Sequence, residues 1–196
     1  MDLHVTDLDG YLWYQKIEKM TAEELRDRIL RKSPPNDRMM MGTAWHSILE
    51  NPPSYDIKEV EKDGYTFTVD CDATILMPQI VEIRAHKTYH IGGYDVTLTG
   101  KVDGITGNMI NDHKLTFRHD VENYFDSYQW RAYLDIFNAD YFTYYIYAAK
   151  EKDKHVTITD ISSFTVYRYP GMVVDLENGI NNMVQFIKTQ IPEMLS

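Results

Sequence analysis

A two-residue turn, Gly107-Asn108, constrains this chain more than any other stretch of its 196 residues. Strand-like sequences flank the turn, and a loop of this length fixes the register of a β-hairpin. Counting outward places Asp103 opposite Asp112. Like charges that face each other across two strands are destabilising, because their Cβ atoms are only about 4.5–5.5 Å apart. The hairpin therefore predicts a positive group between the two aspartates. The same count pairs Thr106 with Met109, Ile105 with Ile110 and Gly104 with Asn111.

A divalent cation is the natural candidate for that positive group, since carboxylate oxygens are preferred ligands of Mg²⁺, Mn²⁺ and Ca²⁺. Lys114 should project from the same strand face as Asp112, because strand side chains alternate with period two. The alternation turns the imidazole of His113 to the other face. The alternative is a solvent-facing hairpin whose acids never meet, with Lys114 as a local counter-charge.

Composition excludes several classes of protein. A single cysteine, Cys71, leaves no disulfide framework and no multi-cysteine zinc or iron–sulfur site, which favours a cytoplasmic setting. The net charge of −10 argues against a general affinity for nucleic acid or anionic membranes, although one local basic groove remains compatible with it. The first residues lack the pattern of a signal peptide, and no stretch approaches the ~20 apolar residues of a membrane helix.

The order of expected elements is helices, an antiparallel meander, a helix, a strand pair and a helix, which indicates a mixed α/β layer fold. Thr21 and Glu24 form a capping box, and Asn36 caps a second helix. Gly92-Gly93 marks another hairpin turn, and Pro78 argues against one continuous strand over 73–91. We expect helices over 22–32, 37–50, 122–138 and 172–190, and strands over 65–69, 141–149 and 161–169.

Four short motifs resemble one nuclease superfamily. "GKVDGITGNMINDHKLT" resembles the core of the PD-(D/E)XK nucleases, in which an acid on one strand is followed by D-x-K on the next. The RecB-like and lambda-type phage exonuclease branch adds three more motifs: G-x-x-x-H, G-x-x-D and Q-x-x-x-Y. The chain matches them with Gly42 and His46, with Gly100 and Asp103, and with Gln129 and Tyr133. Two departures are the missing proline before Asp103 and the missing cysteines of the iron–sulfur members.

The resemblance implies a restriction-endonuclease-like α/β core, with a central mixed sheet flanked by helices. It implies a single nuclease domain over 1–196, with N-terminal helices in 1–50, a catalytic core at about 55–150, and a C-terminal strand and helix in 155–196. The expected function is metal-dependent DNA hydrolysis, with an exonuclease of phage-type recombination or repair favoured. Two alternatives are a structure-specific endonuclease or nickase, and a non-catalytic DNA-binding module of the same fold.

The resemblance also implies roles for the site residues. Asp103, Asp112, the backbone carbonyl of His113 and the imidazole of His46 would hold Mg²⁺ or Mn²⁺, with no iron–sulfur cluster. Lys114 would orient or deprotonate the attacking water and stabilise charge on the phosphate. The alternative for His46 is a satisfied or exposed helical histidine with no ligand.

Gln129 and Tyr133 lie one helical turn apart, so both can face the DNA. Gln129 would hydrogen-bond a phosphate or a metal-bound water, and Tyr133 would contact the DNA backbone. The alternative is a helix packed by its aromatics, with a core stripe beside these two residues at Phe125, Tyr128, Ala132 and Ile136. Further contacts to the DNA backbone are expected from Arg118, His119 and Arg131. The basic helix 26–32 is more remote from the motif. The phage resemblance adds a single-strand annealing protein as a partner, a trimer by analogy, and the host cytoplasm as location.

Overall fold

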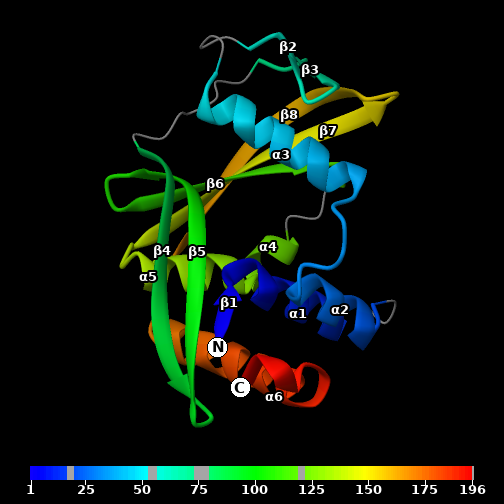
Figure 1. Ribbon diagram of the computed structural model, residues 1–196. Helices are drawn as coiled ribbons and strands as arrows, with labels where there is room; N and C mark the ends of the chain where they lie inside the picture. The colour runs from blue at the N-terminus through cyan, green and yellow to red at the C-terminus, as the bar shows by residue number, and fades with distance from the viewer. Residues whose placement is uncertain (17–19, 53–56, 73–79, 119–121, 196) are drawn as a thin grey trace.

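The computed structural model describes residues 1–16, 20–52, 57–72, 80–118 and 122–195. It contains one eight-stranded mixed sheet, in which a central path runs β1-β5-β6-β7-β8-β3-β2 and β4 pairs with the far edge of β5 (Figure 1). The strands are β1 Asp2–His4, β2 Glu59–Lys62, β3 Tyr65–Val69, β4 Ile80–Ile91, β5 Tyr94–Thr106, β6 Met109–Thr116, β7 Tyr141–Lys152 and β8 His155–Tyr167. The helices are α1 Val5–Lys16, α2 Ala22–Ile29, α3 Asp37–Glu50, α4 Glu122–Asp126, α5 Tyr128–Ile136 and α6 Met172–Gln190, with a 3₁₀ turn at Pro192–Leu195.

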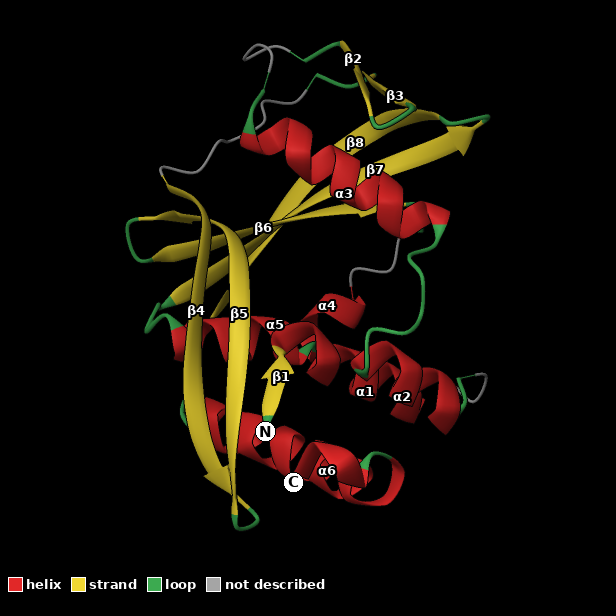
Figure 2. Ribbon diagram, in the orientation of Figure 1, coloured by secondary structure: helices red, strands yellow, loops and turns green. Residues whose placement is uncertain are grey.

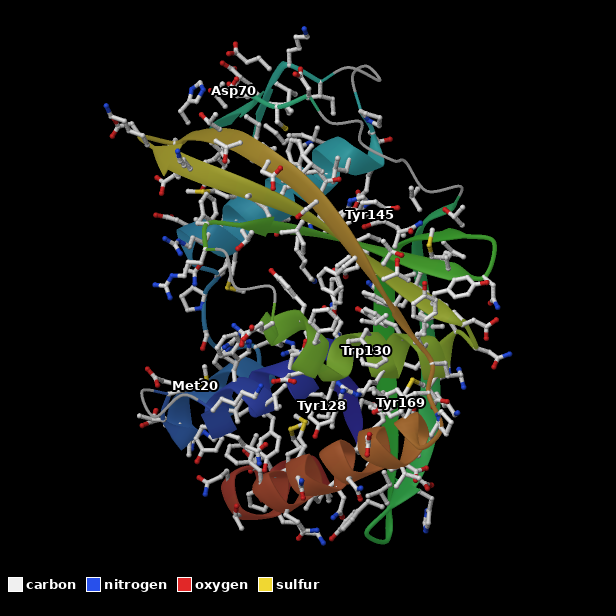
Figure 3. All side chains as sticks on the ribbon, turned by 180° about the vertical axis from the view of Figure 1, so that it is seen from behind. Met20, Asp70, Tyr128, Trp130, Tyr145 and Tyr169 are labelled. Carbon is white, nitrogen blue, oxygen red and sulfur yellow. The ribbon has the colours of Figure 1, made fainter. Side chains whose placement is uncertain are left out.

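Helices cover both faces of the sheet, and β7 supplies side chains to both layers. Tyr144 and Ile146 pack into a large apolar cluster with α1, α2, α5 and α6. Tyr145 and Tyr147 alternate to the other face and pack beneath α3 with Trp45 (Figures 1 and 2). Figure 3 shows the labelled Tyr145 among the central strands, well away from Trp130 on α5. This arrangement confirms the predicted α/β fold with helices on both sides of a mixed sheet.

The sheet opens into a fork between β5 and β6. β4 pairs with β5 along nearly its whole length, so β1 and β6 must share the opposite edge. β1 occupies that edge at Thr97–Thr99, and β6 occupies it at Gly104–Thr106. Between them, residues 100–103 have no strand partner on this edge within the described part of the chain. Beyond the hairpin, β6 continues alongside β7 while β5 runs away from it (Figure 2).

Several sequence predictions are confirmed. The turn Gly107-Asn108 connects β5 and β6, and the three pairs nearest the turn have the predicted register. The predicted fourth pair, Asp103 with Asp112, does not form, because the strands separate there and the Asp103 side chain accepts the His113 amide. Gly107 has a φ of 59°, which the first position of a two-residue hairpin turn requires and glycine adopts at little cost. The capping box of Thr21 and the Asn36 cap are present, although α2 ends at Ile29, three residues before the expected end. No helix in the described residues is long and apolar enough to cross a membrane.

One predicted helix is wrong. The expected helix over 122–138 is broken at Ser127 into α4 and α5, because Ser127 adopts an extended conformation and caps α5. The alternative core stripe is present only in part: Phe125 is 47% exposed, but Ala132 is buried and Tyr128 and Ile136 pack against the core. Gln129 and Tyr133, expected to be free beside this stripe, also lie on the buried face. The strand expected at 161–169 begins six residues earlier, at His155. Pro78 lies outside the described residues.

Candidate active site at the β5–β6 fork

Asp103 lies where β5 and β6 separate. A continuing ladder would pair the amide of His113 with the β5 backbone, but here that amide donates to Asp103 Oδ2 at 2.7 Å. The other oxygen, Oδ1, lies 3.1 Å from Nδ1 of His46 on α3. Burial alone would raise the pKa of Asp103, but the hydrogen bond from His46 and the charges of His46 and Lys114 lower it. The carboxylate is therefore held ionised at the mouth of the fork.

Asp112 and Lys114 form an ion pair on one face of β6, as their spacing predicts. Nζ of Lys114 lies 2.8 Å from Oδ2 of Asp112, whose side chain is only 4% exposed. Nε2 of Gln129 approaches Oδ1 at 3.4 Å. Burial raises the pKa of Asp112 to about 6, against the lowering effect of the Lys114 charge. Although the ammonium is close, no described group donates a well-directed hydrogen bond to Oδ2, so this oxygen keeps acceptor capacity.

The imidazole of His113 points away from Asp112 and Lys114, as the strand alternation predicts. It is buried in the α3 layer, 2.9 Å from the hydroxyl of Tyr147 and stacked on Tyr145. Burial lowers its pKa to about 4, so the ring is neutral near pH 7. The amide and carbonyl of one strand residue point to the same edge. Since the His113 amide reaches Asp103, its carbonyl also faces the fork.

Gln129 depends on an acid that sequence reasoning missed. Asp9, on α1, accepts hydrogen bonds from the hydroxyl of Ser127 at 2.7 Å and from the amides of Tyr128 at 2.8 Å and Gln129 at 3.2 Å. Asp9 and Ser127 are 118 residues apart, and no local pattern links a carboxylate to a helix so distant in sequence.

Tyr133 lies inside the fold and is not free to contact DNA. Its side chain is 3% exposed, its ring stacks on Phe142, and its hydroxyl donates to the carbonyl of Lys101 at 2.8 Å. Lys101 belongs to the unpaired edge of β5, so Tyr133 satisfies a carbonyl that no neighbouring strand reaches. The expected DNA contact at Tyr133 is therefore corrected to a packing role.

The predicted cations are divided between the cleft and the scaffold. Arg118 is exposed beside a cleft of about 430 Å³ that also receives Lys114 and Gln129. Lys16 and Arg28 line the same cleft. Arg131 does not: its guanidinium donates to the carbonyls of Asp126 and Ser127 and stacks on Trp130. His119 lies outside the described residues.

Similarity to known proteins is found in the structure and not in the sequence. No known protein family matches the sequence, and no curated protein does. Among solved structures, the alkaline exonuclease LHK-Exo of Laribacter hongkongensis has a TM-score of 0.55 at 11% identity, covering 98% of this chain and 91% of its own. The same enzyme in complex with dAMP gives 0.56 at 10% identity, covering 98% and 90%. A protein described as SSO0001 gives 0.55 at 13% identity, covering 94% and 75%.

The chain has the fold of the alkaline exonuclease LHK-Exo. At these identities the likeness is one of fold. Residues of all four sequence motifs come together at one fork. His46 reaches it from α3, Asp103 from β5, Asp112 and Lys114 from β6, and Gln129 from α5.

A divalent cation suits the donor types at this fork. Two carboxylates, one imidazole and one carbonyl are oxygen-rich ligands of the kind that Mg²⁺ or Mn²⁺ takes, and Asp112 Oδ2 is a buried acceptor with spare capacity. However, no three described His, Cys, Asp or Glu side chains are gathered as a ready cluster. Asp103 is instead turned to His46, and Asp112 is turned to Lys114. The residue types therefore fit a divalent cation. Its binding would replace the Asp103–His46 and Asp112–Lys114 contacts with contacts to the ion.

Packing explains the glycine of the G-x-x-D motif, Gly100. A Cβ at this position would lie 2.4 Å from Cε1 of Tyr133 and 3.2 Å from Cγ2 of Val5. Gly100→Ala is therefore expected to lower the free energy of unfolding by about 1–3 kcal/mol, the usual cost of overpacking. Gly42→Ala is the matched control, because a Cβ at Gly42 meets nothing within 4 Å and alanine favours a helix. Chemical denaturation measures both, and a Gly100→Ala protein as stable as wild type would contradict the packing argument.

Proposed function

We propose that this chain is a metal-dependent DNA nuclease, and that it acts as an exonuclease in phage-type recombination or repair. The observation that carries the proposal is the meeting of Asp103, Asp112 and Lys114 at the β5–β6 fork, with Lys114 paired to a buried carboxylate. The exonuclease fold supports the same reaction class. The nuclease domain is proposed to span 1–196.

Asp103, Asp112, the carbonyl of His113 and the imidazole of His46 are the proposed ligands of Mg²⁺ or Mn²⁺. When bound, such an ion supplies Lewis-acid stabilisation of negative charge on a phosphate. His46 now pairs with Asp103, and although burial alone would lower the pKa of this imidazole, the Asp103 contact raises it above its ordinary value. Metal binding should therefore release a proton from His46 whenever the ring is charged.

Lys114 is proposed to orient the attacking water and stabilise charge that develops on the phosphate. Burial alone would lower the pKa of Lys114, but the carboxylates of Asp112 and Asp103 raise it above its ordinary value. The side chain is therefore an ammonium near pH 7, which favours charge stabilisation over proton abstraction. Gln129 is proposed to hold Asp112 in place and to donate to a phosphate or a water at the same site.

The cleft beside Lys114 is the proposed path of the DNA backbone. Arg118, Lys16 and Arg28 are exposed cations along it, and contacts of this kind give affinity without sequence choice. By analogy with phage exonucleases, we also propose that the chain forms a trimer and works with a single-strand annealing protein. The proposed location is the cytoplasm of a host cell.

Exonuclease action is distinguished from endonuclease action by substrate topology. We expect Mn²⁺- or Mg²⁺-dependent release of nucleotides from linear duplex DNA, with closed circular DNA left intact. The neighbouring Laribacter enzyme, solved with a mononucleotide, is consistent with a site that takes one nucleotide. Cutting of the closed circle would replace the exonuclease by an endonuclease or nickase, and degradation of RNA alone would change the substrate class.

Metal binding should be visible without turnover. With Mn²⁺ at about 100 times its dissociation constant, the free energy of unfolding should rise by about 2.7 kcal/mol, since the ion binds the folded state alone. Thermal unfolding at increasing Mn²⁺ measures this shift, with an Asp103→Asn variant as the control that should not respond. An equal shift in both proteins would show that the ion binds elsewhere.

A further inference from the structure

The acid that caps α5 lies beside the proposed active site. Asp9 and Gln129 both line the cleft that contains Lys114, and Asp9 is partly buried there. Its two oxygens accept the hydroxyl of Ser127 and the first two amides of α5. A carboxylate at a helix N-terminus is favourable both as a hydrogen-bond acceptor and against the helix dipole. Ser127, the N-cap of α5, also accepts the Gln129 amide through its Oγ at 2.9 Å, so Asp9 fixes the start of α5 together with Ser127.

α5 needs such an external anchor. It has nine residues, fewer than an isolated helix requires to be stable in water, and Ser127 separates it from α4. Gln129 lies in its first turn, so the position of that turn sets the distance from Nε2 of Gln129 to Asp112. At 3.4 Å this contact is already at the long end of hydrogen bonding, and a small displacement of the turn would break it.

We propose that Asp9 is a positioning residue of the active site, which acts by fixing the first turn of α5 and so holding Gln129 against Asp112. The inference rests on the proposed nuclease function. The Lys114 charge also reaches Asp9: burial raises the pKa of Asp9, and Lys114 is among the groups that partly offset that rise. Asp9 itself touches no reacting group, so its effect passes through Gln129.

A double-mutant cycle separates positioning from simple stabilisation. Residues that hold a metal-ligand carboxylate in place typically change activity by about 10–100-fold when removed. Asp9→Ala and Gln129→Ala are each expected to lower kcat by about that factor, and the double variant should be no slower than Gln129→Ala. The KM for DNA should change less than kcat, because the cations of the cleft are unaltered. Asp9→Asn keeps an acceptor oxygen and should retain most of kcat.

Asp7 provides the matched control on the same helix. Its carboxylate is 6% exposed and is bonded to Arg31 at 2.7 Å and to the amide of His4 at 2.8 Å, away from α5. Asp7→Ala should lower the melting temperature but leave kcat unchanged. Hydrogen exchange gives a readout independent of turnover: the amides of Tyr128 and Gln129 should exchange faster in Asp9→Ala and not in Asp7→Ala.

The outcomes separate this inference from the proposed function. Wild-type protein that degrades no DNA with either ion would overturn the proposed function and the inference together. An active wild type would overturn the inference alone if Asp9→Ala kept wild-type kcat, if the two losses multiplied in the double variant, or if the α5 amides were unaffected. Should Asp9→Ala fail to fold, Asp9→Glu keeps the charge but displaces the cap by one methylene. It should still lower kcat, and wild-type kcat in Asp9→Glu would equally overturn the inference.

Discussion

Replacing Lys114 with alanine is expected to lower the rate of DNA hydrolysis by about 10²–10⁴-fold while DNA remains bound. The ammonium lies on the same strand face as Asp112, 2.8 Å from its carboxylate, and is not itself a proposed metal ligand. Its removal should therefore leave the cation in place. DNA affinity should fall only modestly, because one lost phosphate contact weakens binding without abolishing it.

Single-turnover cleavage and equilibrium DNA binding measure the two effects separately. Lys87→Ala is the matched control: Lys87 also contacts a buried carboxylate, that of Asp135, at 2.8 Å, and its pair lies away from the fork. Lys87→Ala should cleave DNA at the wild-type rate. Cleavage by Lys114→Ala within a few-fold of wild type would remove Lys114 from the mechanism.

Asp112→Asn should also stop cleavage, but through loss of the metal. A bound ion contributes several kcal/mol of transition-state stabilisation, which corresponds to a rate loss of about 10³-fold or more. Because the amide keeps one neutral oxygen at the site, excess Mn²⁺ should restore part of the activity of Asp112→Asn. Excess Mn²⁺ should not restore Lys114→Ala, since that variant retains its metal ligands.

Isothermal titration with Mn²⁺ tests directly whether Asp112 is a metal ligand. Asp112→Asn should bind Mn²⁺ more weakly than wild type, whereas Lys114→Ala should bind it as tightly as wild type. Asp135→Asn is the control for removal of a buried, lysine-paired carboxylate elsewhere in the fold. If Asp112→Asn bound Mn²⁺ as tightly as wild type, Asp112 would not be a metal ligand.

The local parts of the site were predictable because short-range rules govern them. The turn at Gly107-Asn108 set the register of the hairpin, and strand alternation put the His113 ring on the face opposite Lys114. The register does not, however, reveal that the strands part at Asp103. That separation depends on α3, which brings His46 to the carboxylate, and on the His113 amide.

The remaining parts depend on contacts between distant segments. Ser127 ends α4 because its hydroxyl and the α5 amides have a partner in Asp9, and sequence periodicity alone favours one continuous helix there. Tyr133 faces inward because Gly100 leaves room for its ring and Lys101 offers a carbonyl. Each of these choices requires a residue from another element, which is why the expected continuous helix and the exposed role of Tyr133 were wrong.

The β5–β6 fork is proposed to hydrolyse phosphodiester bonds with a divalent cation. Incubation of end-labelled linear duplex DNA with wild-type protein and with Lys114→Ala, in Mg²⁺, in Mn²⁺ and with a chelator, tests it most directly. The account predicts progressive loss of label or length with wild type in at least one ion, none with the chelator, and a loss slower by about 10²-fold or more with Lys114→Ala. Wild-type protein that binds the duplex but degrades no DNA in either ion would contradict the account and identify a non-catalytic DNA-binding module.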